Sequence, residues 1–136
     1  MFMIKRLRLL LFSAVICSQA HAKTDIPTLQ MCQQLYEDIR LLAIYSDSCP
    51  DHEQILSQMG YVLGEKVDSI LQPCEKNYSQ KQFQAIELQT NQKLMPEINK
   101  AKEAQAKNQS TVYCQSVKKD LQHIVQKYLP NQDFPN

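Results

Sequence analysis

Four cysteines lie beyond the first 22 residues of the chain: Cys32, Cys49, Cys74 and Cys114. No two of them have the Cys-x-x-Cys spacing of thioredoxin-like redox sites and zinc knuckles, and the Cys-x-x-Cys-His motif of covalent haem attachment is absent. An even number of widely spaced cysteines in an exported chain is most simply two disulfides. These residues therefore predict cross-linking, and the elements that carry them must bring them together in pairs.

The histidines of this part of the chain give little basis for a catalytic or metal site. His52 stands between Asp51 and Glu53, but consecutive residues of a helix point in different directions, so we expect a solvated helix start and no metal site. Met31 and His123 occupy positions similar to those of the ligands in b-type haem bundles. Since His123 lies off the apolar stripe of its segment, we predict no cofactor. No nucleophile or phosphate-loop motif accompanies either histidine, so we predict that the protein is not an enzyme.

The amino terminus has the three parts of a secretory signal peptide. Lys5, Arg6 and Arg8 form a basic region, and residues 9–17 form an apolar segment that is too short to remain across a bilayer. Ala20-His21-Ala22 then supplies a small-x-small cleavage site. We predict cleavage after Ala22 and a location in the periplasm or outside the cell.

Cleavage leaves residues 23–136 as a single domain, because no change of composition divides them and their number suits one core. The alternative is lipoprotein processing at Cys17, where Ile16 occupies a position that prefers a small residue. No later stretch is long and apolar enough for a transmembrane helix, so we predict no membrane anchor.

Charge and composition restrict the class of partner and the class of fold. Without Lys5, Arg6 and Arg8, the 15 basic residues fall to 12 against 14 acidic ones, a net charge of −2. Only Arg40 is then an arginine, so the clustered basic residues that nucleic acids or anionic membranes require are missing. The chain has no Trp and only two glycines, and it is rich in Gln, Lys, Glu, Leu and Ala, which favours helices.

Apolar residues that recur at intervals of three and four predict four helices, over about residues 27–45, 51–72, 79–107 and 111–129. Four amphipathic helices with short connections predict an all-α antiparallel bundle. Thr24 or Asp25 is the expected cap of the first helix. The second and third helices begin with residues that resemble capping boxes, Asp51 with Gln54 and Ser79 with Gln82.

Two prolines are expected to interrupt this pattern. Pro73 should end the second helix, and Pro96 should kink or restart the third, because proline lacks the backbone N–H and its ring clashes with the preceding turn. Residues 97–107 then form a mostly polar helical extension.

The bundle constrains the disulfides. Cys49 and Cys74 lie at opposite ends of the second helix, roughly 30 Å apart at 1.5 Å per residue, whereas bridged Cα atoms lie within about 7 Å. An up-and-down bundle brings Cys32 near Cys74 and Cys49 near Cys114, and we predict these two pairs. The alternative, Cys32–Cys114 with Cys49–Cys74, requires the second helix to fold back on itself.

Both glycines of the chain fall inside the second helix, where each costs about 1 kcal/mol relative to alanine. Another helix packing closely over Gly60 and Gly64 would offset this cost, as would a break of the helix at Gly60. We favour these two explanations over a third, in which the glycines form a groove, rimmed by Tyr61, that receives a partner. Gly60, Tyr61 and Gly64 are the candidate partner-binding residues.

The same segment resembles a known family. Gly60-Tyr61-Val62-Leu63-Gly64, then Asp68 and Cys74, are similar to a pattern in small periplasmic immunity proteins that neutralise type VI secretion amidase effectors. The resemblance covers residues 60–74. It departs from the family's pattern in lacking a Cys just before Tyr61 and a hydrophobic-Pro pair after Cys74. It implies an exported, all-helical, disulfide-bonded protein whose partner is an effector enzyme.

We therefore predict a non-catalytic protein that binds a partner protein, in its most specific form an immunity-type inhibitor of a cell-wall-degrading effector. The alternative is a periplasmic chaperone or an accessory protein of envelope or secretion assembly, with the polar residues 97–109 as a flexible arm. We predict no nucleic-acid partner.

Overall fold

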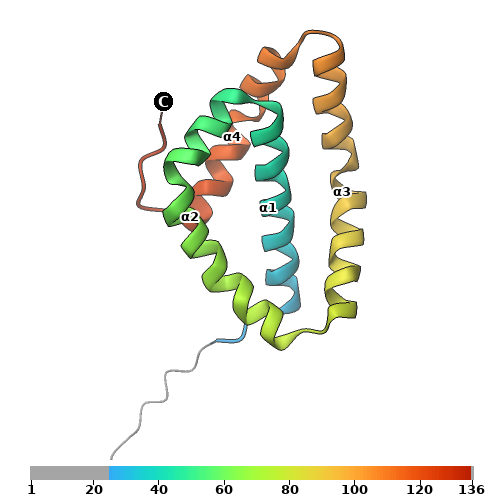
Figure 1. Cartoon of the computed structure of the whole chain (residues 1–136), viewed down its shortest axis with the longest axis vertical. Coiled ribbons are helices and arrows are strands. Elements are labelled where there is room, and N and C mark those ends of the chain that lie inside the picture. Colours follow the sequence, from blue (N-terminus) through green and yellow to red (C-terminus); the bar gives the residue numbers. More distant parts are fainter. Residues whose placement is uncertain (1–24, 136) are drawn as a thin grey trace, which may run out of the picture.

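The computed structural model describes residues 25–135, and the predicted signal peptide, residues 1–22, lies outside this range. The described chain contains four α-helices and no strand: α1 (Leu29–Ser48), α2 (Pro50–Asn77), α3 (Gln80–Ala106) and α4 (Ser110–Tyr128). Successive helices run in opposite directions (Figure 1). The predicted all-α antiparallel bundle of four helices is therefore confirmed. Within residues 25–135, no helix is both long and apolar enough to cross a membrane.

α1 is the central helix of the bundle. It packs against α2, α3 and α4, and α4 also packs against α2 and α3, whereas the backbones of α2 and α3 do not come close to each other in the described chain. Figure 1 shows α2 and α3 on opposite sides of α1. Because three helices surround α1, it buries polar residues as well as apolar ones, and Glu37 and Asp38 are among them.

The start of α3 was predicted correctly and the start of α1 was not. Ser79 and Gln82 form the predicted capping box, with both reciprocal hydrogen bonds present. α1 is capped by Thr28, whose hydroxyl accepts the backbone N–H three residues later. The predicted caps Thr24 and Asp25 are wrong because α1 begins only after Pro27.

The connection between α1 and α2 is a single residue, Cys49, which lies between Ser48 and Pro50. α2 begins at Pro50, since a proline at the first helical position loses no hydrogen bond. The predicted capping box of Asp51 and Gln54 is therefore wrong, and no side chain caps α2. This short connection holds the first turn of α2 tightly against α1.

Both prolines lie inside continuous helices, so the predicted stop at Pro73 and the predicted restart at Pro96 are wrong. The other possibility at Pro96, a kink, stays a prediction. An interior proline costs about 3 kcal/mol or more, and packing after each proline offsets this cost. The turn after Pro73 carries the buried Cys74, and the turn after Pro96 leads to the buried Ala101. Residues 97–107 are thus part of the packed bundle through Ala101.

The core has two parts. The smaller one consists of Cys32, Cys74 and Ile86, with Tyr36 and Phe83 packed against it. The larger one fills the space where α1, α2, α4 and the end of α3 meet. Its largest members are Leu35, Leu42, Tyr45, Met59, Leu63, Tyr113, Leu121, Ile124, Val125 and Tyr128.

One disulfide closes each end of the bundle, and both predicted pairings are confirmed. Cys32–Cys74 joins α1 to α2 with a Cα–Cα distance of 5.9 Å. Cys49–Cys114 joins the α1–α2 connection to α4 with a Cα–Cα distance of 5.7 Å. Because α2 is continuous, Cys49 and Cys74 are at its opposite ends, as the pairing argument required.

Candidate functional site

The three candidate partner-binding residues lie in the middle of α2. Tyr61 is 78% exposed, so its ring projects from the helix instead of rimming a groove. Gly60 beside it is exposed, and Gly64, one turn later, is partly exposed. The three residues therefore form one outward-facing stretch of helix.

Neither glycine makes room for another helix. A β-carbon built at Gly60 or Gly64 meets no heavy atom within 4 Å outside its own stretch of helix. The preferred prediction, close packing over a notch of small residues, is therefore wrong. The predicted break at Gly60 is also wrong, because α2 runs through it. The physical reason is that α2 turns a different side, with Met59 and Leu63, toward the core.

Replacing either glycine with alanine should stabilise the free protein. An added methyl group meets nothing at these positions, and alanine is the better helix former by about 0.5–1 kcal/mol. We expect Gly60→Ala and Gly64→Ala each to raise the free energy of unfolding by that amount in urea titrations. A lower stability for Gly60→Ala would show that this glycine serves the fold of the free protein.

Acidic side chains border the exposed stretch. Glu65 and Asp68 follow Tyr61 at intervals of four and seven residues, so they lie on the same side of α2, and both are exposed. None of the ion pairs of the described chain involves α2. The surface of α2 thus presents an aromatic ring, bare backbone and unpaired carboxylates side by side.

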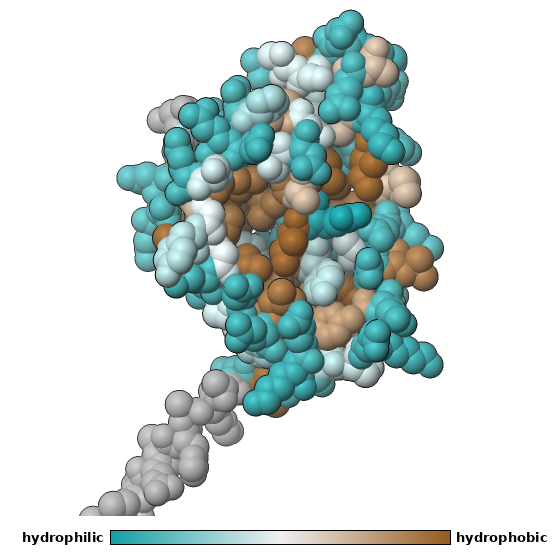
Figure 2. All heavy atoms as spheres, viewed as in Figure 1, coloured by the Kyte–Doolittle hydropathy of each residue, from teal (hydrophilic) through white to brown (hydrophobic). Residues whose placement is uncertain are grey.

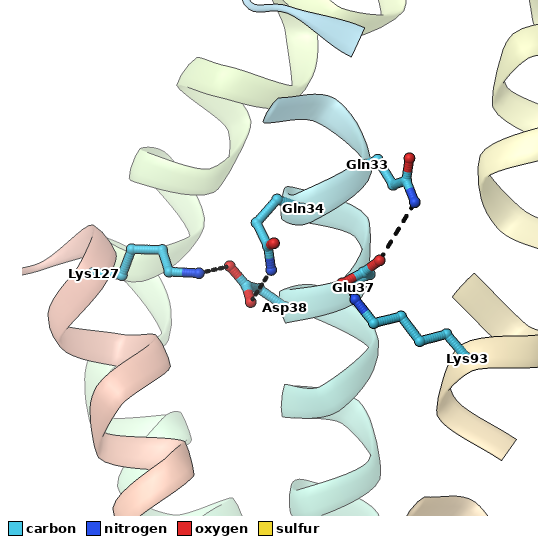
Figure 3. Close-up of polar contacts among 6 residues, drawn as sticks. All are labelled: Gln33, Gln34, Glu37, Asp38, Lys93 and Lys127. Carbon is cyan, nitrogen blue, oxygen red and sulfur yellow. Dashed lines mark hydrogen bonds and ion pairs between the residues drawn. The ribbon is translucent and has the colours of Figure 1, made fainter. Parts of the chain in front are cut away.

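Apart from the exposed stretch of α2, the structure has a buried carboxylate, that of Asp38 on α1, which was not identified from the sequence. Its side chain is 3% exposed. It accepts hydrogen bonds from Gln34 Nε2 at 3.2 Å, from Lys127 Nζ at 2.7 Å and from the Tyr128 hydroxyl. Figure 3 shows Lys127 reaching from α4 to this carboxylate. Burial and the hydrogen bond to Asp38 raise the pKa of Tyr128, so its hydroxyl keeps its proton and remains a donor.

The neighbouring carboxylate, Glu37, makes the equivalent link on the other side of α1. It is 7% exposed and accepts a hydrogen bond from Lys93 Nζ of α3 at 2.6 Å. Figure 3 shows the side chains of Glu37 and Asp38 directed to opposite sides of α1. Since a lysine neutralises each carboxylate, the pair ties α1 to both α3 and α4.

A sequence signal for Asp38 did exist. Leu35, Leu42 and Tyr45 are buried on α1, and Asp38 falls between them at the same intervals of three and four residues. An acidic residue at a core position needs a cationic or hydrogen-bonding partner. The sequence could not show that Lys127 and Tyr128 would supply it, because they are about 90 residues away.

His52 was predicted to lie in a solvated helix start, and this prediction is wrong. The residue is only 3% exposed, because the single-residue connection before α2 holds its ring against α1. The ring lies edge-on to Tyr45, with centroids 6.5 Å apart. Its Nδ1 atom is buried and has no hydrogen-bond partner among the described residues.

Acidification should weaken the fold through His52. Burial lowers the pKa of its imidazole below the ordinary 6.5, and Lys118 lowers it further while Asp51 opposes the shift. The imidazole therefore binds a proton more readily in the unfolded chain than in the folded protein, so the free energy of unfolding falls as the pH drops below about 6.5. Urea titrations between about pH 7 and pH 5 should show this loss in the wild type and in His123→Gln. An equal loss in His52→Phe would contradict the assignment.

The other residues that were considered as ligands lie at the surface. Met31 is 55% exposed and His123 is exposed on α4, so the two do not face each other across the core. Among residues 25–135, no three His, Cys, Asp or Glu side chains are grouped as a metal site would require.

Comparison with known proteins gives no match to a protein-family model, to a curated protein or to a solved structure.

Proposed function

We propose that this is a small exported protein without catalytic activity that binds a partner protein through the surface around Gly60, Tyr61 and Gly64. The observation that supports this most is the pair of glycines. Together they weaken α2 by about 2 kcal/mol relative to alanine, and no described contact uses the space that their missing side chains leave. A partner protein that packs closely against Gly60 and Gly64 supplies contacts that offset this cost.

The chemistry of the stretch suits a protein contact. Without β-carbons, Gly60 and Gly64 let another backbone approach the helix closely. Tyr61 supplies a large, rigid, amphipathic side chain of the kind that dominates binding energy in many interfaces. The unpaired Glu65 and Asp68 beside it add directional polar contacts.

In its most specific form, we propose that the partner is a cell-wall-degrading effector enzyme and that this protein is its immunity-type inhibitor. The resemblance of residues 60–74 to the immunity family supports this form. The two disulfides are compatible with a periplasmic or secreted location, where such an effector would act.

A chaperone or envelope-assembly accessory protein is the second candidate. Leu88 and Met95 favour it, because they are exposed on α3 and lie seven residues apart, on one side of that helix. The flexible arm predicted for residues 97–109 does not support it, since α3 continues to Ala106 and buries Ala101.

The test is purification of the oxidised protein from its native periplasm, followed by mass spectrometry of what co-elutes. The proposal expects one hydrolase in stoichiometric amount. Tyr61→Ala and Gly60→Leu should lose this partner, whereas Gln89→Leu, which places the same side chain on the exposed face of α3, should keep it.

A folded Gly60→Leu protein that still binds the hydrolase would overturn the proposed surface. A spread of unrelated clients would favour the chaperone, above all if Leu88→Ser and Met95→Ser released them. No co-eluting protein at all would overturn both candidates.

A further inference from the structure

Two exposed surfaces of the described chain lie on opposite sides of the bundle. One is the stretch of α2 around Gly60 and Gly64, where an added β-carbon meets nothing. The other is the outer side of α3, where Leu88 and Met95 are 60% and 48% exposed, and Figure 2 shows hydrophobic atoms along that edge of the molecule. Because α2 and α3 lie on opposite sides of α1 (Figure 1), one molecule cannot bring these two surfaces together.

The outer side of α3 carries a regular row of side chains. Four exposed residues follow one another there at intervals of seven: Lys81, Leu88, Met95 and Lys102. Residues seven apart lie on the same side of a helix. The row therefore has two apolar side chains in its middle and one cation at each end.

The exposed side of α2 has a complementary row. Gly60 and Gly64 stand in its middle. Glu53 lies seven residues before the first glycine, and Glu75 lies eleven residues after the second. Intervals of seven and eleven are close to whole numbers of helical turns, so these residues share one side of α2, and both glutamates are exposed. This row has bare backbone in its middle and one anion at each end.

The two rows also match in length. At 1.5 Å per residue, the two glutamates are about 33 Å apart along α2 and the two lysines are about 32 Å apart along α3. None of these four charged residues belongs to an ion pair of the described chain. When both charges are paired, Leu88 lies against Gly60 if the two helices are parallel, and Met95 does so if they are antiparallel. In either direction an apolar side chain meets the glycines.

We propose that a second copy of this chain covers the α2 surface with the outer side of its α3. The glycines let the second α3 approach closely, and its apolar side chains fill the space that no described contact uses. The lysines at the two ends of the row pair with Glu53 and Glu75. Because the two surfaces lie on opposite sides of the bundle, the contact is head-to-tail and leaves a free surface at each end of the assembly.

This inference rests on the proposed function in placing a contact on the α2 surface, and it adds a regulation of that surface: a partner protein must displace the second copy. One helix side per molecule buries less area than the roughly 1,000 Å² that a stable interface needs. We therefore expect a Kd on the order of 100 μM, against which a tightly binding effector enzyme competes successfully.

The test is sedimentation velocity of the oxidised, purified protein alone, so its result does not depend on whether a hydrolase is found. The weight-average mass should rise with concentration around the expected Kd and should not level off at a dimer. Salt at about 1 M should weaken the association, because it shortens the Debye length to about 3 Å. A wild-type protein that stays monomeric about tenfold above the expected Kd, or that stops at a dimer, would overturn the proposal.

Charge reversal tests the pairing of the rows. The double variant Lys81→Glu with Lys102→Glu should be monomeric, and so should Glu53→Lys with Glu75→Lys, because like charges then face each other. An equal mixture of the two should associate again, since lysines face glutamates at every contact between unlike variants. A mixture that stays monomeric although both variants are folded would contradict the proposed contact.

A matched pair of serine variants tests the apolar part. Leu88→Ser with Met95→Ser should weaken the association at least tenfold, because two apolar side chains lose their burial. Val112→Ser, which removes an exposed apolar side chain from α4, should leave it unchanged. Equal effects in the two proteins would show that α3 is not the docking side. Circular dichroism checks that each variant is folded.

Discussion

Reduction of both disulfides should unfold the protein. Loops of 42 and 65 residues separate the bridged cysteines, and cross-links that close loops of this length each stabilise a fold by about 4 kcal/mol in the chain-entropy model. Domains of this size are stable by only about 5–15 kcal/mol. Loss of both bridges therefore removes most or all of the net stability, which circular dichroism with and without reductant would show.

Paired serine variants separate the two bridges. Cys32→Ser with Cys74→Ser, and Cys49→Ser with Cys114→Ser, should each lower the urea midpoint by roughly 2 M, since about 4 kcal/mol is divided by a slope of about 2 kcal/mol/M. Each single-bridge protein should remain folded at 25 °C and unfold on reduction. A reduced wild-type protein with its full helical signal and an unchanged midpoint would contradict the role assigned to the bridges.

The disulfide pairing could be predicted from sequence because it needs only the length of a helix. α2 was expected to be continuous between Cys49 and Cys74, and its rise per residue excluded a bridge between its ends. The capping box at Ser79 was equally local, since donor and acceptor lie within one turn. These predictions succeeded because no distant contact was needed to decide them.

The failed predictions for the two prolines, for His52 and for the glycines depend on tertiary contacts. Proline is unfavourable inside a helix, but burial of Cys74 and Ala101 beyond the two prolines outweighs that preference. His52 looked solvated because the sequence did not show how closely the single residue Cys49 would draw α2 against α1. The glycines looked like a packing site because the sequence did not show that no neighbouring helix passes over their side of α2.

The pair Glu37–Asp38 explains how the central helix is held in register with its neighbours. Apolar contacts permit sliding of one helix along another, whereas the hydrogen bonds of Asp38 with Lys127 and Tyr128 fix one position of α4 on α1. Lys93 does the same for α3 through Glu37. Since the backbones of α2 and α3 do not come close to each other in the described chain, the positions of these two outer helices relative to each other depend mainly on α1 and α4.

Asp38→Asn should lower the free energy of unfolding by about 3 kcal/mol, the lower end of the cost of breaking a buried ion pair. Asparagine keeps the shape of the side chain but replaces one acceptor oxygen with a donor, which then faces the donors Lys127 and Tyr128. The cost stays at the lower end because Lys127 is 40% exposed and can turn to water. Urea titration against Asp47→Asn, an exposed site on the same helix, measures it, and the control should change stability by no more than about 0.5 kcal/mol.

A double-mutant cycle then shows whether the ion pair itself carries the effect. If it does, Lys127→Met should cost much less in the Asp38→Asn background than in the wild type, with a coupling of about 0.5–3 kcal/mol. Additive costs would mean that Tyr128 and Gln34 hold the carboxylate and that Lys127 contributes only its aliphatic stem. A loss below about 1 kcal/mol for Asp38→Asn would mean that apolar packing alone sets the register of α4, because an ordinary hydrogen bond contributes about that much.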